Sequence, residues 1–185
     1  MNHFEERISG KEIYTGKFLK LNCDKVKLEN GRETTRDVIR HPGGVCVAAL
    51  DENLNIFMVT QYRYPYDKEL LELPAGKLEY GENPVEAGKR ELEEETGYMT
   101  TEDLISLGKM YPSAAYTDEI IYMYYTTKLK KTQMHLDEGE FLTLSKLHFW
   151  KVYDMVLSGE IVDAKTQIAI LKLGSILMEN GNEDK

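Results

Sequence analysis

The sequence is poor in cysteine, in basic charge and in long apolar runs, and each shortage excludes a class of protein. The 185 residues include only two cysteines, Cys23 and Cys46, which is too few for a disulfide-stapled secreted scaffold. We expect both thiols to be reduced and buried in a cytoplasmic protein. No stretch approaches about 18 uncharged apolar residues, so a transmembrane helix is not expected. The first ten residues contain acidic side chains and no apolar segment, unlike a signal peptide.

The chain carries 23 basic and 32 acidic residues, a net charge of −9. This balance argues against a nucleic-acid-binding protein, which usually has a basic surplus. It remains compatible with a small anionic substrate. Such a substrate would need metal ions to bridge it to the carboxylates of the protein.

The length predicts one domain of about 150 residues with a small appendage. We expect an N-terminal β segment over residues 1–42, a main domain over residues 43–180 and a polar tail over residues 181–185. The order of expected elements is strands, helix, strands, helices, which is typical of an α+β fold with a mixed sheet.

A hairpin is predicted where the partly alternating segment 21–28 meets Asn30-Gly31 and returns as a strand over residues 34–40. Both turn residues tolerate positive φ, which favours a two-residue type I′ turn. Residues 45–50 form an unbroken apolar run, as in a strand buried on both faces. Further strands are expected over residues 56–62, 104–110 and 120–127.

Three helices are expected from their start and stop signals. Asn83 and Pro84 indicate an N-cap and first helical position, and Gly97 indicates the end of that helix. Ser145 is a candidate cap for a second helix ending near Gly159, and Asp163 for a third ending at Gly181.

The first of these helices carries Glu91, Glu94 and Glu95 at spacings that place their carboxylates on one face. Like charges so placed repel each other unless the face is solvated or neutralised by cations. Carboxylate oxygens are the ligands that Mg²⁺ takes, and Arg90 could hold one of these side chains in place.

The complete spacing favours the cation alternative. The fixed positions are Gly76, Glu82, Arg90, Glu91, Glu94, Glu95 and Gly97. This pattern resembles the Nudix box, G-x5-E-x7-R-E-U-x-E-E-x-G-U, with every fixed position filled. The resemblance implies a Nudix α/β/α sandwich with a mixed sheet, and hydrolysis of a nucleoside diphosphate derivative assisted by divalent metal. It also implies that Glu91, Glu95 and the carbonyl of Ala75 bind metal, while Glu94 and Arg90 belong to the catalytic group.

Outside the box the sequence is similar to the ADP-ribose pyrophosphatases from about Tyr14 to Leu173. The similarity is carried by His41-Pro42-Gly43-Gly44, Gln61-Tyr62-Arg63, Leu71 to Gly76, Ser113 with Asp118-Glu119, and Asp137 to Glu140. It implies substrate contacts from Arg63 and Glu119, and contacts from Arg36 and Asp37 that reach over from a homodimer partner. It further implies Glu140 as a metal ligand and Glu138 as the general base, with a box glutamate as the alternative base.

The implied reaction is Mg²⁺-dependent hydrolysis of ADP-ribose to AMP and ribose 5-phosphate, with Mn²⁺ or another divalent cation as the alternative metal. Ala114 follows Ser113 where the family often has proline, which leaves open GDP-mannose or another nucleoside diphosphate derivative. A Nudix module that senses a nucleotide without catalysis is a further alternative.

Local alternatives also stay open for the individual residues. Arg63 could pair with a surface carboxylate, and Arg36 with Asp37 could form a cross-strand ion pair. Residues 137–140 could be a solvated acidic loop.

Overall fold

The computed structural model describes residues 3–183 and divides into two compact units. The smaller unit comprises the chain up to Gly43 together with Tyr111–Ile120, and the larger comprises Gly44–Met110 and the chain from Ile121 onward. Within residues 3–183, no helix is both long and apolar enough to cross a membrane.

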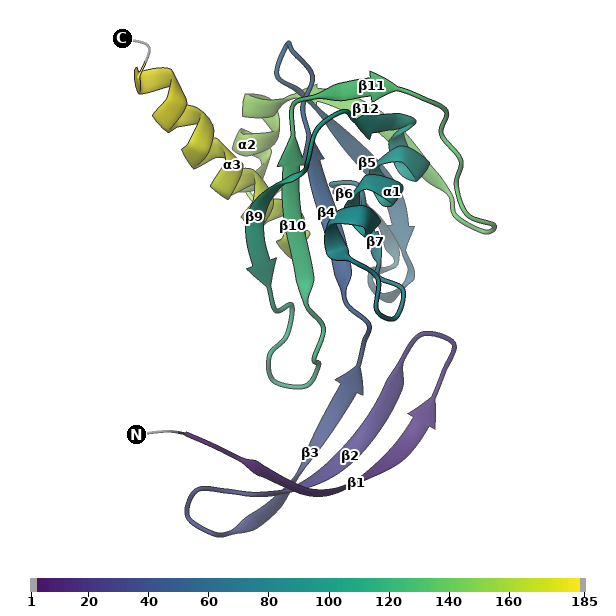
Figure 1. Cartoon of the computed structure of the whole chain (residues 1–185), viewed down its shortest axis with the longest axis vertical. Coiled ribbons are helices and arrows are strands. Elements are labelled where there is room, and N and C mark those ends of the chain that lie inside the picture. Colours follow the sequence, from purple (N-terminus) through teal and green to yellow (C-terminus); the bar gives the residue numbers. More distant parts are fainter. Residues whose placement is uncertain (1–2, 184–185) are drawn as a thin grey trace. The chain divides into compact units, whose positions relative to one another are not determined.

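The smaller unit is a three-stranded antiparallel sheet in the order β1-β2-β3 (Figure 1). Its strands are β1 (Glu6–Thr15), β2 (Lys20–Lys27) and β3 (Glu33–Arg40). The predicted hairpin is confirmed, but its turn type is not. Within the turn, only Gly31 has a positive φ, at 81°. The N–H of Leu28 donates to the carbonyl of Arg32 at 2.8 Å. The turn is therefore a three-residue loop with glycine in the left-handed position.

The segment 111–120 joins this small sheet through β3. Ile39 and Thr117 form a parallel bridge, in which the N–H of Ile39 donates to the carbonyl of Tyr116 at 2.7 Å. Asp118 accepts from the guanidinium of Arg40 at 3.1 Å and from the N–H of His41 at 2.9 Å. Residues distant in sequence thus fix the end of β3.

The larger unit contains the remaining strands (Figure 1). They are β4 (Gly44–Ala49), β5 (Asn55–Arg63), β6 (Lys68–Glu72), β7 (Ala75–Lys77), β8 (Tyr98–Thr100), β9 (Ile105–Met110), β10 (Ile121–Thr126), β11 (Leu129–Lys131) and β12 (Leu142–His148). One sheet has the order β7-β4-β10-β9, another has the order β12-β5-β6, and β11 pairs with β8. Because β10 runs parallel to β4 and antiparallel to β9, the sheet is mixed, as predicted.

Strand β4 lies between two apolar layers and is buried along its whole length. Val45, Val47 and Ala49 pack into the cluster on the side of helix α1 (Pro84–Thr96). Cys46, Ala48 and Leu50 alternate to the opposite cluster, which contains α2 (Phe149–Leu157) and α3 (Ala164–Glu183). This alternation across a buried strand produces a helix–sheet–helix sandwich.

The end signals of α1 and the cap of α3 act as predicted. The side chain of Asn83 accepts from the N–H of Val85 at 2.8 Å, and Gly97 ends α1 in the left-handed conformation at φ 68°. Asp163 accepts from the N–H of Thr166 at 2.9 Å and so caps α3. Helix α3 continues through Gly181 to Glu183. The predicted polar tail over residues 181–185 therefore begins inside the helix, and residues 184 and 185 lie outside the described residues.

The predicted start of the second helix is wrong. Ser145 lies in β12, which pairs antiparallel with β5, and α2 begins only at Phe149. The serine is a weak helix-cap signal here. The backbone groups that a cap would bond are already paired with the buried strand β5.

Candidate active site

The box glycine, Gly76, lies in close contact with Glu91, the second glutamate of the box. Gly76 lies in β7, and a β-carbon at this position would lie 1.9 Å from the carboxyl carbon of Glu91 on α1. A glycine here lets the strand approach the helix this closely without displacing the Glu91 carboxylate. The fixed glycine of the pattern is therefore a packing requirement of the carboxylate.

Arg90 organises the acidic face of α1. Its Nη1 donates to Glu91 at 2.8 Å and to Glu94 at 2.9 Å, and its Nε donates to Glu82 at 3.2 Å. Glu82 in turn accepts from the N–H of Glu79 at 2.8 Å. One arginine thus anchors three box carboxylates and closes the loop that precedes the helix.

Glu95 is the most deeply buried box carboxylate, with 4% of the residue exposed. Its Oε2 accepts from the N–H of Ala75 at 2.9 Å, which places it against the β6–β7 segment. Burial, with repulsion from Glu91 and Glu140, raises the pKa of Glu95 to about 8, although the Ala75 N–H and the charge of Lys165 oppose this rise. Burial likewise raises the pKa of Glu91 to about 7, against the opposing charge of Arg90.

The acidic loop of residues 137–140 is near α1. The charge of Glu140 contributes to the raised pKa of both Glu91 and Glu95. A turn brings the N–H of Glu140 to the carbonyl of Asp137 at 3.0 Å, and Glu138 is exposed within it. The structure therefore brings Glu140 into the electrostatic range of the box and leaves Glu138 free to face solvent.

The carboxylates fit a hard divalent cation in their chemistry. Glu91, Glu95 and Glu140 supply oxygen donors, the type that Mg²⁺ prefers. Burial and repulsion between these carboxylates raise the pKa of Glu91 and Glu95, and a bound cation would offset both effects. Over residues 3–183, no three His, Cys, Asp or Glu side chains are already arranged as a closed cation site.

A second charged cluster, made of Glu72, Arg63 and Lys165, lies outside the box. The sequence did not predict it. Glu72, at the end of β6, has 1% of its side chain exposed. It accepts from Nε and Nη2 of Arg63 at 2.7 and 2.6 Å, and also from Nζ of Lys165 on α3. The predicted alternative of an ion pair for Arg63 is thus what the structure shows, although its partner is buried. No sequence signal pointed to Lys165, one of two lysines in α3.

The other predicted substrate contacts lie in the smaller unit. Arg36 donates to Glu5 at 2.7 and 3.0 Å, so its ion pair is with Glu5 and not with Asp37. Asp37 lies opposite Cys23, and burial together with this carboxylate raises the pKa of the thiol. Glu119 lies 3.5 Å from Nδ1 of His41. Each of these side chains has a local partner.

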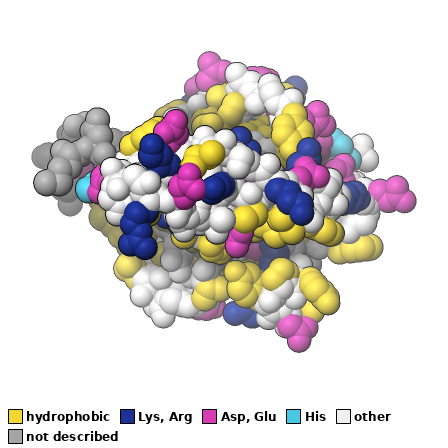
Figure 2. All heavy atoms as spheres, turned by 90° about the horizontal axis from the view of Figure 1, so that it is seen from below, with side chains coloured by type: hydrophobic (Ala, Val, Ile, Leu, Met, Phe, Trp, Pro, Cys, Tyr) yellow, Lys and Arg dark blue, Asp and Glu magenta, His cyan; other side chains and the backbone are white. Residues whose placement is uncertain are grey.

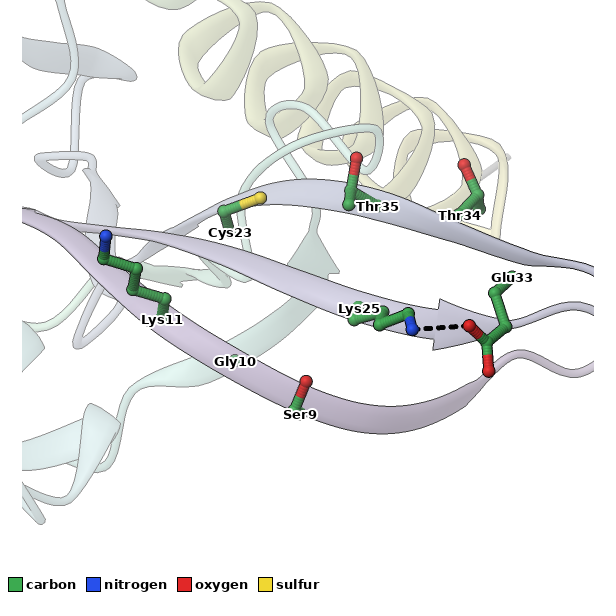
Figure 3. A pocket seen from close by; sticks show the side chains of 8 residues that line it. All are labelled: Ser9, Gly10, Lys11, Cys23, Lys25, Glu33, Thr34 and Thr35. Atoms are coloured by element: carbon green, nitrogen blue, oxygen red, sulfur yellow. Dashed lines mark ion pairs between the residues drawn. The ribbon is translucent and has the colours of Figure 1, made fainter.

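The surface of the smaller unit also carries a hollow of about 450 Å³ on one face of its sheet (Figure 3). Lys11, Cys23 and Lys25 line it, and Lys25 is paired with Glu33 at 2.5 Å. None of the box residues lines this hollow. Figure 2 shows Lys and Arg side chains interspersed with acidic and hydrophobic ones on the face seen there, which differs from the basic stripe of a nucleic-acid-binding surface.

Replacing Gly76 by alanine is expected to lower kcat/KM by about 10²-fold while the protein stays folded. The new methyl group would displace the Glu91 carboxylate, and a displacement of about 1 Å in a catalytic group costs this much. Since a flexible side chain yields rather than the backbone, the melting temperature should change little. Gly159→Ala is the contrasting control, because Gly159 has φ 79° and no neighbour within 4 Å. It should lower the melting temperature and keep kcat/KM.

Comparison with known proteins gives consistent matches. The NUDIX domain model matches residues 40–165. The methanol dehydrogenase activator of Bacillus methanolicus is 42% identical, covering 90% of this chain and 91% of its own. The ADP-ribose pyrophosphatase of Bacillus subtilis is 39% identical (92% and 93% covered), and that of Mycobacterium tuberculosis is 34% identical (94% and 85%). A crystal structure of an ADP compounds hydrolase matches with a TM-score of 0.82 at 17% identity, covering 96% of both chains, which shows the fold.

Proposed function

The chain belongs to the Nudix family, and we propose that it hydrolyses the pyrophosphate bond of ADP-ribose to give AMP and ribose 5-phosphate. The observation that carries this proposal is the complete box, in which Glu95 is buried against Ala75 and the partly buried Glu91 lies beside Gly76. Two ADP-ribose pyrophosphatases that match nearly the whole chain support the choice of substrate.

Divalent cations, with Mg²⁺ as the first choice, are proposed to be held by Glu91, Glu95, Glu140 and the carbonyl of Ala75. When bound, such cations neutralise the pyrophosphate charge and lower the pKa of a coordinated water. Arg90 orients the carboxylates of Glu91 and Glu94, and Glu82 holds Arg90 in turn. Metal and protons compete for the raised-pKa carboxylates, so metal binding should weaken as the pH falls below about 7.

Glu138 is proposed as the general base, because its exposed turn can close over a bound pyrophosphate and take a proton from the attacking water. Arg63 is proposed to contact a phosphate oxygen. Its bidentate contact with Glu72 fixes the guanidinium plane, while 36% of its side chain stays exposed for a ligand. Arg36, Asp37 and Glu119 are proposed as the remaining substrate contacts.

A substrate panel tests this proposal. The purified protein is incubated with Mg²⁺ and equal concentrations of ADP-ribose, GDP-mannose and a dinucleoside polyphosphate, and the products are identified by mass. ADP-ribose should give the highest kcat/KM. A value more than about tenfold higher for another substrate, which corresponds to about 1.4 kcal/mol, would assign the site to that substrate instead.

The smaller unit supports a homodimer. All ten residues of β1 are exposed along the sheet edge, including Ile8, Ile13 and Tyr14, and a three-stranded sheet of this size buries little of its own surface. We propose that a second copy covers this sheet and that Arg36 and Asp37 then approach the partner's site.

Sedimentation should accordingly give a homodimer. The double variant Ile8→Asp, Ile13→Asp should shift the protein toward monomer and reduce its hydrolytic rate. Leu157→Asp is the matched control, because Leu157 is 64% exposed at the end of α2 in the larger unit and should stay dimeric. A wild-type monomer with full activity would refute the proposal.

We propose a cytoplasmic location from the state of the two cysteines. Cys23 and Cys46 are both free thiols, Cys46 is buried, and Cys23 is partly exposed. Two unpaired thiols support a reducing compartment, as in the cytoplasm.

A second candidate function comes from the Bacillus methanolicus relative, which is named as an activator of methanol dehydrogenase. Its 42% identity over 90% of this chain favours a test of the same activity here. Adding this protein to purified methanol dehydrogenase should then raise the rate of methanol oxidation. An increase that Glu95→Gln also produces would separate activation from hydrolysis.

A further inference from the structure

The first turn of α3 is tied to the end of β6 by a buried chain of polar contacts. Nζ of Lys165 contacts Glu72 and also Asp163, the latter at 3.0 Å. The hydroxyl of Thr166 donates to Asp163 at 2.6 Å and accepts from the N–H of Leu73 at 2.9 Å. Lys165 has 10% of its side chain exposed, Glu72 has 1%, and Thr166 is fully buried.

These contacts hold the short segment that leads into the proposed metal site. Lys165 and Thr166 of α3 bind Glu72 and Leu73, respectively. The carbonyl of Pro74 accepts from the N–H of Val47 at 3.0 Å. The next residue, Ala75, donates its N–H to Glu95 at 2.9 Å. The position of the Ala75 peptide and of the Glu95 carboxylate therefore depends on how firmly residues 72–74 are held.

We propose that Lys165 and Thr166 are positioning residues for the metal site, acting through Glu72 and Leu73 on the Ala75 carbonyl and the Glu95 carboxylate. This inference rests on the proposed function, because it concerns the metal that the box would hold. The two residues reach the site from a helix that contributes no box residue. Lys165 contacts Glu72 and Thr166 contacts Leu73, and the residues in each contact are 93 positions apart in the sequence.

A purely structural role would give a different pattern. Breaking a buried ion pair destabilises a protein by leaving a charge without a partner. If stability were the only role, a variant that is still folded would bind metal as the wild type does. In contrast, removing a group that orients a metal ligand without binding the metal lowers metal affinity or activity by about 10 to 100-fold.

The test is a Mn²⁺ titration of the full chain, followed by the electron paramagnetic resonance signal of the free ion. Lys165→Met, measured at a temperature where circular dichroism shows it folded, should raise the Mn²⁺ dissociation constant about tenfold or more. Lys165→Arg keeps the charge and should stay within about threefold of the wild type. Lys172→Met is the matched control on the same helix, because Lys172 donates to the carbonyl of Leu107 at 2.6 Å and should bind Mn²⁺ normally.

Thr166→Val tests the second link without removing a charge. It keeps the side-chain shape and deletes the acceptor of the Leu73 N–H, so it should also weaken Mn²⁺ binding. This variant decides the question if Lys165→Met does not fold. Folded variants at Lys165 and Thr166 that bind Mn²⁺ within twofold of the wild type would overturn the proposal.

The two proposals can fail separately. A wild-type protein that binds Mn²⁺ but hydrolyses no nucleoside diphosphate derivative would refute the proposed function, and the comparison of dissociation constants would still test Lys165. A wild-type protein that binds no Mn²⁺ would overturn both.

Discussion

Glu95→Gln is expected to lower kcat at low Mg²⁺ by about 10²-fold or more, with partial recovery in excess Mg²⁺. A neutral amide is a poorer ligand for a hard cation than a carboxylate. The lost stabilisation, about 2.7 kcal/mol for 10²-fold, is within what a metal ion supplies to a developing negative charge. The side chain is held by the N–H of Ala75 at 2.9 Å, so the substitution changes the ligand without releasing it into solvent.

Glu93→Gln is the matched control for this prediction. Glu93 lies on the same helix, is partly exposed and is not a fixed position of the box. It should keep near-normal kcat and the same Mg²⁺ dependence. A Glu95→Gln enzyme with unchanged turnover at low Mg²⁺ would show that this carboxylate holds no catalytic metal.

Glu138→Gln is expected to lower kcat by about 10² to 10⁴-fold, the usual contribution of a general base. Glutamine keeps the shape of the side chain but cannot accept the proton of the attacking water. Because Glu138 is not proposed as a ligand, excess Mg²⁺ should not restore the rate, and KM should stay near the wild-type value. The measurement is kcat and KM over a range of Mg²⁺ concentrations.

Asp137→Asn serves as the neighbouring control, since it changes the charge of the same turn by the same amount. It should reduce kcat far less. Near-normal turnover in Glu138→Gln, together with an irrecoverable loss in Glu94→Gln, would move the base from the loop to the helix.

The parts of the fold that follow from local signals were predictable. Asn83 and Gly97 delimit α1 because a cap side chain and a left-handed glycine act on the backbone beside them. The apolar run of β4 was recognisable because a strand buried on both faces carries few polar residues.

Elements fixed by distant partners were not predictable. Strand β1 is exposed at every position, so no alternation marks it, and β8 and β11 have only three residues each. Ser145 was misassigned because its place in β12 depends on pairing with Met58 in β5. Residue type and spacing alone could not have indicated these contacts.

The candidate site divides in the same way. The carboxylates of α1 could be predicted, because a helix of known start converts spacings of three and four into one face. The contacts of Glu72 with Arg63 and Lys165 could not, since the three residues come from β6, β5 and α3 and meet only in the packed core. The burial of Glu72 is also a tertiary property.

The most direct test of the account is the hydrolysis of ADP-ribose by the wild-type protein, followed by mass spectrometry, with Mg²⁺ and then with excess chelator. AMP and ribose 5-phosphate are expected in the presence of Mg²⁺, and both products should be lost in chelator and recovered when Mg²⁺ is restored. Undiminished turnover in excess chelator would contradict it, because the carboxylates of Glu91 and Glu95 would then have no role as metal ligands.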